Sequence, residues 1–181
     1  MSIAVRDELL AITALDALEQ QHLSDALAWV ESGAPLYRVE KPATPPKHLV
    51  SYFVLVDAEH LLLVDHIQAG LWLPSGGHVE PGEHPRETVL REIKEELDFD
   101  VAASDIGAPL MITCTRTVGS TLPHTDVSLW YVVRGDRRAA IAFEQAEFHA
   151  VRWFAFDAIP FHRCDPHLGR FLEKLRRCRN F

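Results

Sequence analysis

The sequence of 181 residues predicts an α+β fold in which a mixed β-sheet lies between helices, with a helical extension at the N-terminus. Leucine and isoleucine recur at helical spacing over the first 33 residues, and a proline-rich stretch follows. Short apolar segments then follow, with one highly charged segment among them. We therefore expect a helical extension at 1–34, a linker at 35–47 and a single domain at 48–181.

The composition bounds the class of protein. At 48% hydrophobic and 24% charged residues, it is that of an ordinary globular protein. No apolar run reaches 18 residues, so no membrane span is expected, and the N-terminus lacks the pattern of a signal peptide. A net charge of −8 argues against nucleic-acid binding by bulk electrostatics. Three widely spaced cysteines form no metal-binding pattern, which favours a reduced, cytoplasmic setting.

The N-terminal extension reads as two short helices. The second is expected to begin near Thr13 or Ser24, and Gly33 and Pro35 end the pattern. Acidic residues in this region, such as Glu19, are interpreted as solvated. The extension could pack on the domain, cover a substrate cleft or form the contact of a homodimer.

Five later segments have the apolar, β-branched and aromatic composition of strands: 50–56, 61–64, 108–118, 127–133 and 150–154. The first two are separated by a tight turn, which predicts a hairpin, and the alternation in the third and fourth predicts an antiparallel pair. A final helix is expected to begin with Asp165 as its N-cap and Pro166 in its first turn.

The segment 77–99 carries the clearest chemical signal. Pro85 suits the first turn of a helix and good helix formers follow it, which predicts a helix over 85–97. Glu92, Glu95 and Glu96 then share one helix face, about 5–6 Å apart. Like charges at that spacing repel by roughly 3 kcal/mol at an effective dielectric constant of 20, so a cation is favoured. Carboxylate oxygens suit Mg²⁺ or Mn²⁺.

The polar and glycine positions of this segment have a regular spacing: Gly77, then Glu83 after five residues, Arg91-Glu92 after seven more, and Glu95-Glu96 after a further two. The segment resembles the Nudix box of the Nudix (MutT-like) hydrolases at every charged position. It departs from the box at Asp98, where the family has a glycine that ends the helix, and Asp tolerates the left-handed conformation there. The resemblance extends loosely over about 48–178, but only the box is specific.

The resemblance implies roles for the box residues. Glu92, Glu95 and Glu96 resemble the carboxylates that bind metal and activate water, and which of them is the base stays open. Gly77 resembles the residue whose carbonyl completes the metal shell. Glu83 and Arg91 resemble the supporting pair that fixes the loop against the helix.

The implied activity is Mg²⁺- or Mn²⁺-dependent cleavage of the phosphoanhydride bond of a nucleoside triphosphate or another nucleoside diphosphate derivative. Candidate substrate-contacting residues lie beyond the box: Arg116, His124, Asp126, Glu144 and Glu147. Arg116 could bind a phosphate with two hydrogen bonds. Many relatives place a further metal-binding or base carboxylate in the region of Glu144 and Glu147. For each of the five, the alternative is an ordinary loop or surface residue.

Two positions bear on the substrate. Relatives that act on ADP-ribose usually have proline where this chain has Cys114, and those that act on dinucleoside polyphosphates often have tyrosine where it has Arg116. Neither marker is present, which favours nucleoside triphosphates; ADP-ribose, nucleotide sugars and dinucleoside polyphosphates stay open. Two other readings are a nucleotide-binding regulatory module, which would be expected to lack the carboxylates, and an isoprenoid-diphosphate isomerase. The latter would need a catalytic cysteine and a histidine-rich metal site upstream of the box, and no cysteine precedes Cys114.

Overall fold

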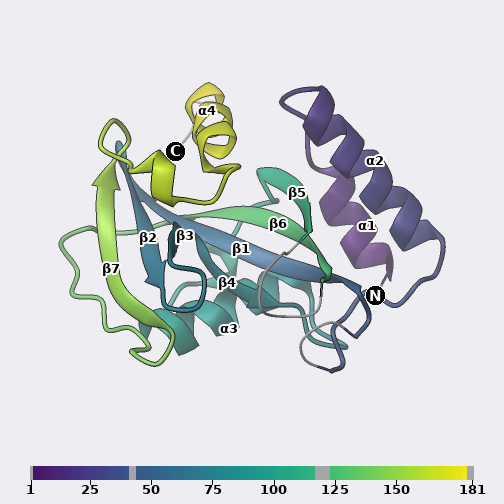
Figure 1. Ribbon diagram of the computed structural model, residues 1–181, viewed down its shortest axis with the longest axis horizontal. Helices are drawn as coiled ribbons and strands as arrows, with labels where there is room; N and C mark the ends of the chain where they lie inside the picture. The colour runs from purple at the N-terminus through teal and green to yellow at the C-terminus, as the bar shows by residue number, and fades with distance from the viewer. Residues whose placement is uncertain (1, 41–43, 117–122, 179–181) are drawn as a thin grey trace.

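The computed structural model describes residues 2–40, 44–116 and 123–178, which form a mixed sheet between helices (Figure 1). The helices are α1 (Ser2–Leu10), α2 (Ala17–Glu31), α3 (Pro85–Leu97) and α4 (Leu168–Arg177), with 3₁₀ turns at Ala103–Asp105 and Phe161–Arg163. The strands are β1 (Lys47–Asp57), β2 (His60–His66), β3 (Leu71–Leu73), β4 (Ser75–His78), β5 (Met111–Arg116), β6 (Thr125–Arg134) and β7 (Phe148–Ala155). The predicted α+β fold with a mixed sheet is confirmed.

Strand β1 is the centre of the sheet. The order is β3-β2-β1-β6-β5, with β4 also paired to β1 and β7 to β2. β1 and β6 run parallel from Lys47↔Thr125 to Val56↔Arg134, whereas the other pairs are antiparallel. Because β1 is covered on both faces, its sequence is a nearly continuous apolar run rather than an alternating one.

The helices cover the two faces of this sheet unequally. Buried side chains of α1, α2 and α3 share one apolar core with one face, and α4 forms a second core on the other face. In the second core Phe171 of α4 lies against Trp130 of β6, with ring centroids 5.3 Å apart. Among the described helices, none combines the length and the apolarity that crossing a membrane requires.

The extension forms two helices, as predicted, but the second begins at neither expected residue. Asp16 is its N-cap, with a carboxylate that accepts the Glu19 N–H at 2.9 Å, and the helix runs through Ser24 without a break. The interpretation of Glu19 as solvated is wrong, because it is fully buried and paired with the buried Lys174 of α4. The extension therefore carries buried charges as well as apolar side chains into contact with the sheet and α4.

Several boundaries differ from the sequence expectation. The last helix begins at Leu168 with His167 as N-cap, because the Asp165 carboxylate accepts the His167 N–H and the Asp165 carbonyl accepts the Leu168 N–H in a preceding turn. Gly76 and Gly77 lie within β4. The expected strand over 108–118 begins at Met111, and residues 117–118 lie outside the described part of the chain. The predicted hairpin and antiparallel pair are confirmed.

Candidate functional site

Helix α3 spans the predicted range and is fixed at both ends. At its start, His84 Nδ1 accepts the Arg86 N–H at 3.2 Å, while the Glu87 carboxylate accepts the His84 N–H at 2.8 Å. Such reciprocal capping satisfies N–H groups that a helix start otherwise leaves unpaired. At its end Asp98 adopts the left-handed conformation, with φ 45° and ψ 48°, which is where the box resemblance places glycine.

Three carboxylates on α3 form a face that runs from buried to open; we call Glu92, Glu95 and Glu96 the carboxylate cluster. The Glu92 side chain is 12% exposed and that of Glu95 is 60% exposed, whereas Glu96 is buried. Glu96 Oε2 accepts hydrogen bonds from the Ser75 hydroxyl and, at 3.2 Å, from the Gly76 N–H. The cluster thus lies directly against strand β4.

Burial raises the pKa of two of these carboxyl groups. The pKa of Glu96 is raised to about 8, mainly by burial, against the hydrogen bond from Ser75 and with the charge of Glu92 adding to the effect. Burial also raises the pKa of Glu92, while its hydrogen bond from Arg91 opposes the shift. Burial and mutual repulsion disfavour the charged forms of these carboxyl groups, and a cation bound among them would stabilise those charged forms.

Gly77 of β4 approaches the cluster so closely that a side chain is excluded. A Cβ atom at this position would lie 1.8 Å from Glu92 Oε1. Strand β4 is held there by its pairing with β1, where Gly77 lies opposite Ser51. The Gly77 backbone therefore lies directly against the Glu92 carboxylate, and the carboxylate oxygens of the cluster are hard donors that fit Mg²⁺ or Mn²⁺.

Arg91 connects the cluster to the turn that precedes α3. Its guanidinium donates to both carboxylate oxygens of Glu83, at 2.9 and 3.1 Å, and to the His78 carbonyl at 3.2 Å. It also reaches Glu92 at 2.6 Å and Glu95 at 3.2 Å. Burial opposes ionisation of Glu83, but the bonds from Arg91 keep its pKa below the usual value. Arg91 therefore orients two cluster carboxylates while it ties three segments together.

The candidate substrate residues divide into separate groups. Arg116 is exposed at the end of β5. Glu144 is exposed, and its backbone N–H donates to the Glu96 carbonyl at 3.0 Å. Glu147 is also exposed, and its charge contributes to the raised pKa values of Glu92 and Glu96. Glu147 thus lies near the carboxylate cluster, Glu144 adjoins it through the backbone, and Arg116 is not brought into it.

His124 and Asp126 belong to a second group with His48 and His78, which we call the histidine cluster. His48 Nε2 lies 3.0 Å from Asp126 Oδ1 and 3.1 Å from His78 Nε2. His124 Nε2 is 3.6 Å from the same Asp126 oxygen, and its ring stacks on His48 with centroids 5.0 Å apart. Burial, with the charge of Arg38 second, lowers the pKa of His78 to about 3.

Sequence reasoning missed three of the residues around these clusters: His48, His78 and Arg38. His48 pairs with Asp126 in the β1–β6 register, which no local pattern specifies. Arg38, in the expected linker, is half-buried and interacts electrostatically with Asp126 and Glu92. Its charge therefore acts on a member of each cluster. A signal for His78 was available, because it directly follows Gly77 of the box.

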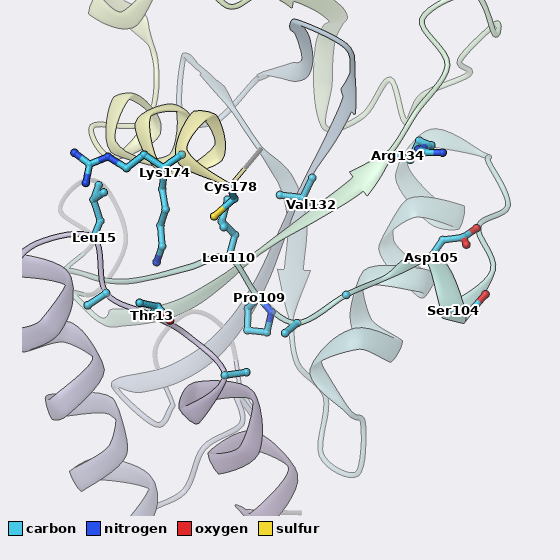
Figure 2. A pocket seen from close by; sticks show the side chains of 15 residues that line it. Thr13, Leu15, Ser104, Asp105, Pro109, Leu110, Val132, Arg134, Lys174 and Cys178 are labelled. Atoms are coloured by element: carbon cyan, nitrogen blue, oxygen red, sulfur yellow. The ribbon is translucent and has the colours of Figure 1, made fainter. Parts of the chain in front are cut away.

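A separate cavity lies away from both clusters. A hollow of about 890 Å³ opens between the α1–α2 connection, the segment before β5, and α4 (Figure 2). Lys174 of α4 and Cys178 at the C-cap of this helix line it, together with Val132 and Arg134 of β6. No member of either cluster lines it. It is a gap between the extension and the rest of the chain.

Comparison with protein-family models gives a match to the NUDIX domain over residues 46–175. The chain is 41% identical over 51 residues to a putative 8-oxo-dGTP diphosphatase of Bacillus subtilis, which covers 28% of this chain and 34% of that protein. It is 35% identical over 65 residues to the CTP pyrophosphohydrolase of Escherichia coli, covering 36% of this chain and 44% of the relative. These matches thus span less than half of either relative's length.

A longer match is to the asymmetrical bis(5'-nucleosyl)-tetraphosphatase of Rattus norvegicus, 32% identical over 111 residues, covering 61% of this chain and 74% of the relative. Among solved structures, a MutT protein from Methanosarcina mazei aligns with a TM-score of 0.57 and 18% identity, over 75% of this chain and 97% of that one. A NUDIX-family hydrolase from Clostridium perfringens aligns with a TM-score of 0.54 and 21% identity, over 72% and 97%. The structural likenesses establish the fold.

Proposed function

The chain belongs to the Nudix (MutT-like) hydrolase family, and on that premise we propose that it cleaves the phosphoanhydride bond of a nucleoside triphosphate, or of another nucleoside diphosphate derivative, with Mg²⁺ or Mn²⁺. The observation that carries the proposal is the close contact of Gly77 in β4 with the carboxylate cluster on α3. That arrangement gathers oxygen ligands where like charges otherwise repel.

In this proposal Glu95, Glu96 and the Gly77 carbonyl hold the ion. A bound divalent cation neutralises charge on phosphate oxygens and lowers the pKa of water. Glu96 is held in place by the Ser75 hydroxyl and the Gly76 N–H, so its carboxylate has little freedom to rotate. Glu92 either completes the ligand set or accepts the proton of the attacking water. Its raised pKa suits the second role, because a better base removes the proton more readily.

The other box residues act through the carboxylate cluster. Arg91 is oriented by two bonds to Glu83 and keeps Glu92 and Glu95 directed towards the same place.

Outside the box, Arg38 is a candidate contact for substrate phosphate, since its half-buried guanidinium already interacts electrostatically with Glu92. Glu147 is a candidate for a further metal or base carboxylate, because its charge reaches Glu92 and Glu96.

Nucleoside triphosphates are the favoured substrate class. The names of two relatives, an 8-oxo-dGTP diphosphatase and a CTP pyrophosphohydrolase, specify nucleoside triphosphates. Cys114 and Arg116 occupy the marker positions of the ADP-ribose and dinucleoside-polyphosphate groups without their marker residues. We also propose a cytoplasmic location, since Cys114, Cys164 and Cys178 are all free thiols.

The test is turnover of a nucleotide panel with Mg²⁺ or Mn²⁺, followed by phosphate release through a coupling enzyme. The panel holds canonical and oxidised nucleoside triphosphates, ADP-ribose, nucleotide sugars and dinucleoside polyphosphates. We expect selective turnover of triphosphates, reduced by roughly 10²-fold or more in Glu95→Gln, a loss typical of removing one transition-state electrostatic contact. Glu173→Gln, the same change on the exposed face of α4, serves as the control and should retain activity.

Two outcomes would contradict the proposal. Near-wild-type turnover in Glu95→Gln with metal present would remove the carboxylate cluster from the reaction. Absence of turnover across the panel, with metal-dependent nucleotide binding intact, would instead support a nucleotide-binding regulatory module.

A further inference from the structure

The histidine cluster joins three strands that are remote in sequence. His48 lies at the start of β1, His78 at the end of β4, and Asp126 at the start of β6, with His124 just before it. One ligand-type atom from each of His48, His124 and Asp126 lies within 4.8 Å of the others. The His48 side chain is completely buried, and those of His124 and Asp126 are 10% and 15% exposed.

The hydrogen bonds of His48 leave a particular atom facing the carboxylate. Its Nδ1 lies 2.9 Å from the Pro45 carbonyl, which can only accept, so Nδ1 carries a hydrogen. In a neutral ring Nε2 is then an acceptor, and it lies 3.0 Å from Asp126 Oδ1, which is also an acceptor. Within the described part of the chain, that buried oxygen receives no well-formed hydrogen bond. A cation between the two atoms would remove this conflict.

Several separations within the cluster are close to those of a transition-metal site. Zinc bound tetrahedrally at about 2.0–2.1 Å holds its ligand atoms roughly 3.3 Å apart. The observed separations are 3.0 Å from His48 to Asp126, 3.1 Å from His48 to His78, 3.6 Å from His124 to Asp126 and 3.9 Å from His78 to Asp126. A bond from the second ring nitrogen to a backbone carbonyl, as His48 makes to Pro45, is the usual way a metal-binding imidazole is oriented.

We propose that His48, His124 and Asp126 bind a divalent transition metal of the zinc class, with the His78 ring beside them. Imidazole nitrogen favours Zn²⁺, Co²⁺ and similar ions, whereas carboxylate and carbonyl oxygens favour Mg²⁺ and Mn²⁺. This site is therefore chemically distinct from the carboxylate cluster, although the adjacent residues Gly77 and His78 connect the two. The bound ion would link β1 to β6 beside the carboxylate cluster. The inference does not depend on the hydrolase activity.

The test is metal titration of the full chain after removal of bound metal with a chelator. Co²⁺ is added with excess Mg²⁺ present, so that the carboxylate cluster is occupied by the harder ion. We expect one equivalent of Co²⁺ to give the visible absorption of four-coordinate cobalt, Zn²⁺ to displace it, and Zn²⁺ to raise the melting temperature. Because the readout is a spectrum, failure of the hydrolase proposal would leave this result unaffected.

Matched variants assign the signal. His124→Asn and Asp126→Asn, each first checked for folding by circular dichroism, should weaken Co²⁺ binding by at least about 100-fold, since each lacks a direct ligand. His149→Asn, an exposed histidine of β7, and Glu95→Gln should bind as the wild type does. His48→Asn is a weaker test because the residue is fully buried and the variant could fail to fold.

Three results would overturn the inference. The first is no cobalt spectrum in the presence of Mg²⁺, which would mean that a protonated His48 pairs with Asp126. The second is an unchanged spectrum in the folded His124→Asn and Asp126→Asn variants. The third is loss of the spectrum in Glu95→Gln, which would place the ion at the carboxylate cluster.

Discussion

The carboxylate cluster and the histidine cluster lie on either side of the adjacent residues Gly77 and His78, and each offers ligand atoms for a different kind of metal ion. The carboxylate cluster comes from a single helix, is partly open to solvent and offers oxygen atoms. The histidine cluster comes from three strands, is mostly buried and offers mainly nitrogen atoms. The first arrangement suits a hard ion that exchanges with substrate, and the second suits a tightly held ion that does not. Proximity in space therefore does not imply shared chemistry.

Deletion of the N-terminal extension should have the largest effect, because it would unfold the chain and disrupt both clusters. We propose that residues 1–34 are required for the fold of the remaining chain, because Glu8 binds Tyr131 and Arg86, and Glu19 pairs with Lys174. Removing one partner of a buried pair typically costs about 3–5 kcal/mol. Deletion of 1–34 should abolish cooperative unfolding in urea, whereas Glu31→Gln, at an exposed ion pair, should change stability by less than about 0.5 kcal/mol. A cooperative transition in the truncated chain would contradict this.

Substitution of Gly77 should have a smaller effect, which disturbs the carboxylate cluster but not the histidine cluster. In Gly77→Ala the new methyl group must displace the Glu92 carboxylate, which lies 1.8 Å from its position. The end of a glutamate side chain can move, so we expect the fold to survive and kcat/KM to fall by about 10–100-fold, as for a misplaced catalytic group. The cobalt spectrum of the histidine cluster should be unchanged.

Gly107→Ala is the control, since a methyl group there meets open space. Equal losses of turnover in the two glycine variants would show that contact with Glu92 is not the cause. Loss of the cobalt spectrum in Gly77→Ala alone would show that the two clusters depend on one another.

The smallest effects should be opposite pH dependences of stability in the metal-free protein. The pKa of Glu96 is raised from 4.5 to about 8, so between these values the folded chain holds a proton that the unfolded chain has released. Stability should therefore fall as pH rises through that window. The pKa of His78 is lowered from 6.5 to about 3, so there the unfolded chain binds the extra proton and stability should fall as pH decreases. Each slope is at most about 1.4 kcal/mol per pH unit.

Melting temperatures measured between pH 4 and 9 in chelator would resolve the two dependences. Glu96→Gln should flatten the decline between about pH 6.5 and 8, and His78→Asn should flatten the decline in acid. Retention of both slopes in both variants would mean that other groups control the response.

The difference between the clusters also explains what could be predicted from sequence. Glu92, Glu95 and Glu96 share a face because of helical spacing alone, so the sequence was enough to group them. The histidine cluster depends on the registers that place His48 opposite Asp126 and Val50 opposite His78. Those registers are set by tertiary packing across the whole sheet, which no local pattern encodes.

Two of the sequence expectations were wrong for different physical reasons. Asp165 was expected to cap the last helix because Asp followed by Pro is a common helix start, but its carboxylate and carbonyl instead close a turn that ends at Leu168. Glu19 was expected to be solvated, as most glutamates are. Its partner Lys174 lies 155 residues further along the chain, so only the folded structure could show that it is buried.

The parallel pairing of β1 with β6 has a consequence for synthesis of the protein. β1 has β2 and β4 on one edge, but its other edge is completed only when residues 125–134 have been made. During translation an apolar strand would therefore emerge well before its parallel neighbour, with backbone hydrogen-bonding groups unpaired. Ladders between such distant segments form slowly because loop closure comes first. The nascent chain should consequently be most prone to aggregate, and most dependent on chaperones, just before β6 leaves the ribosome.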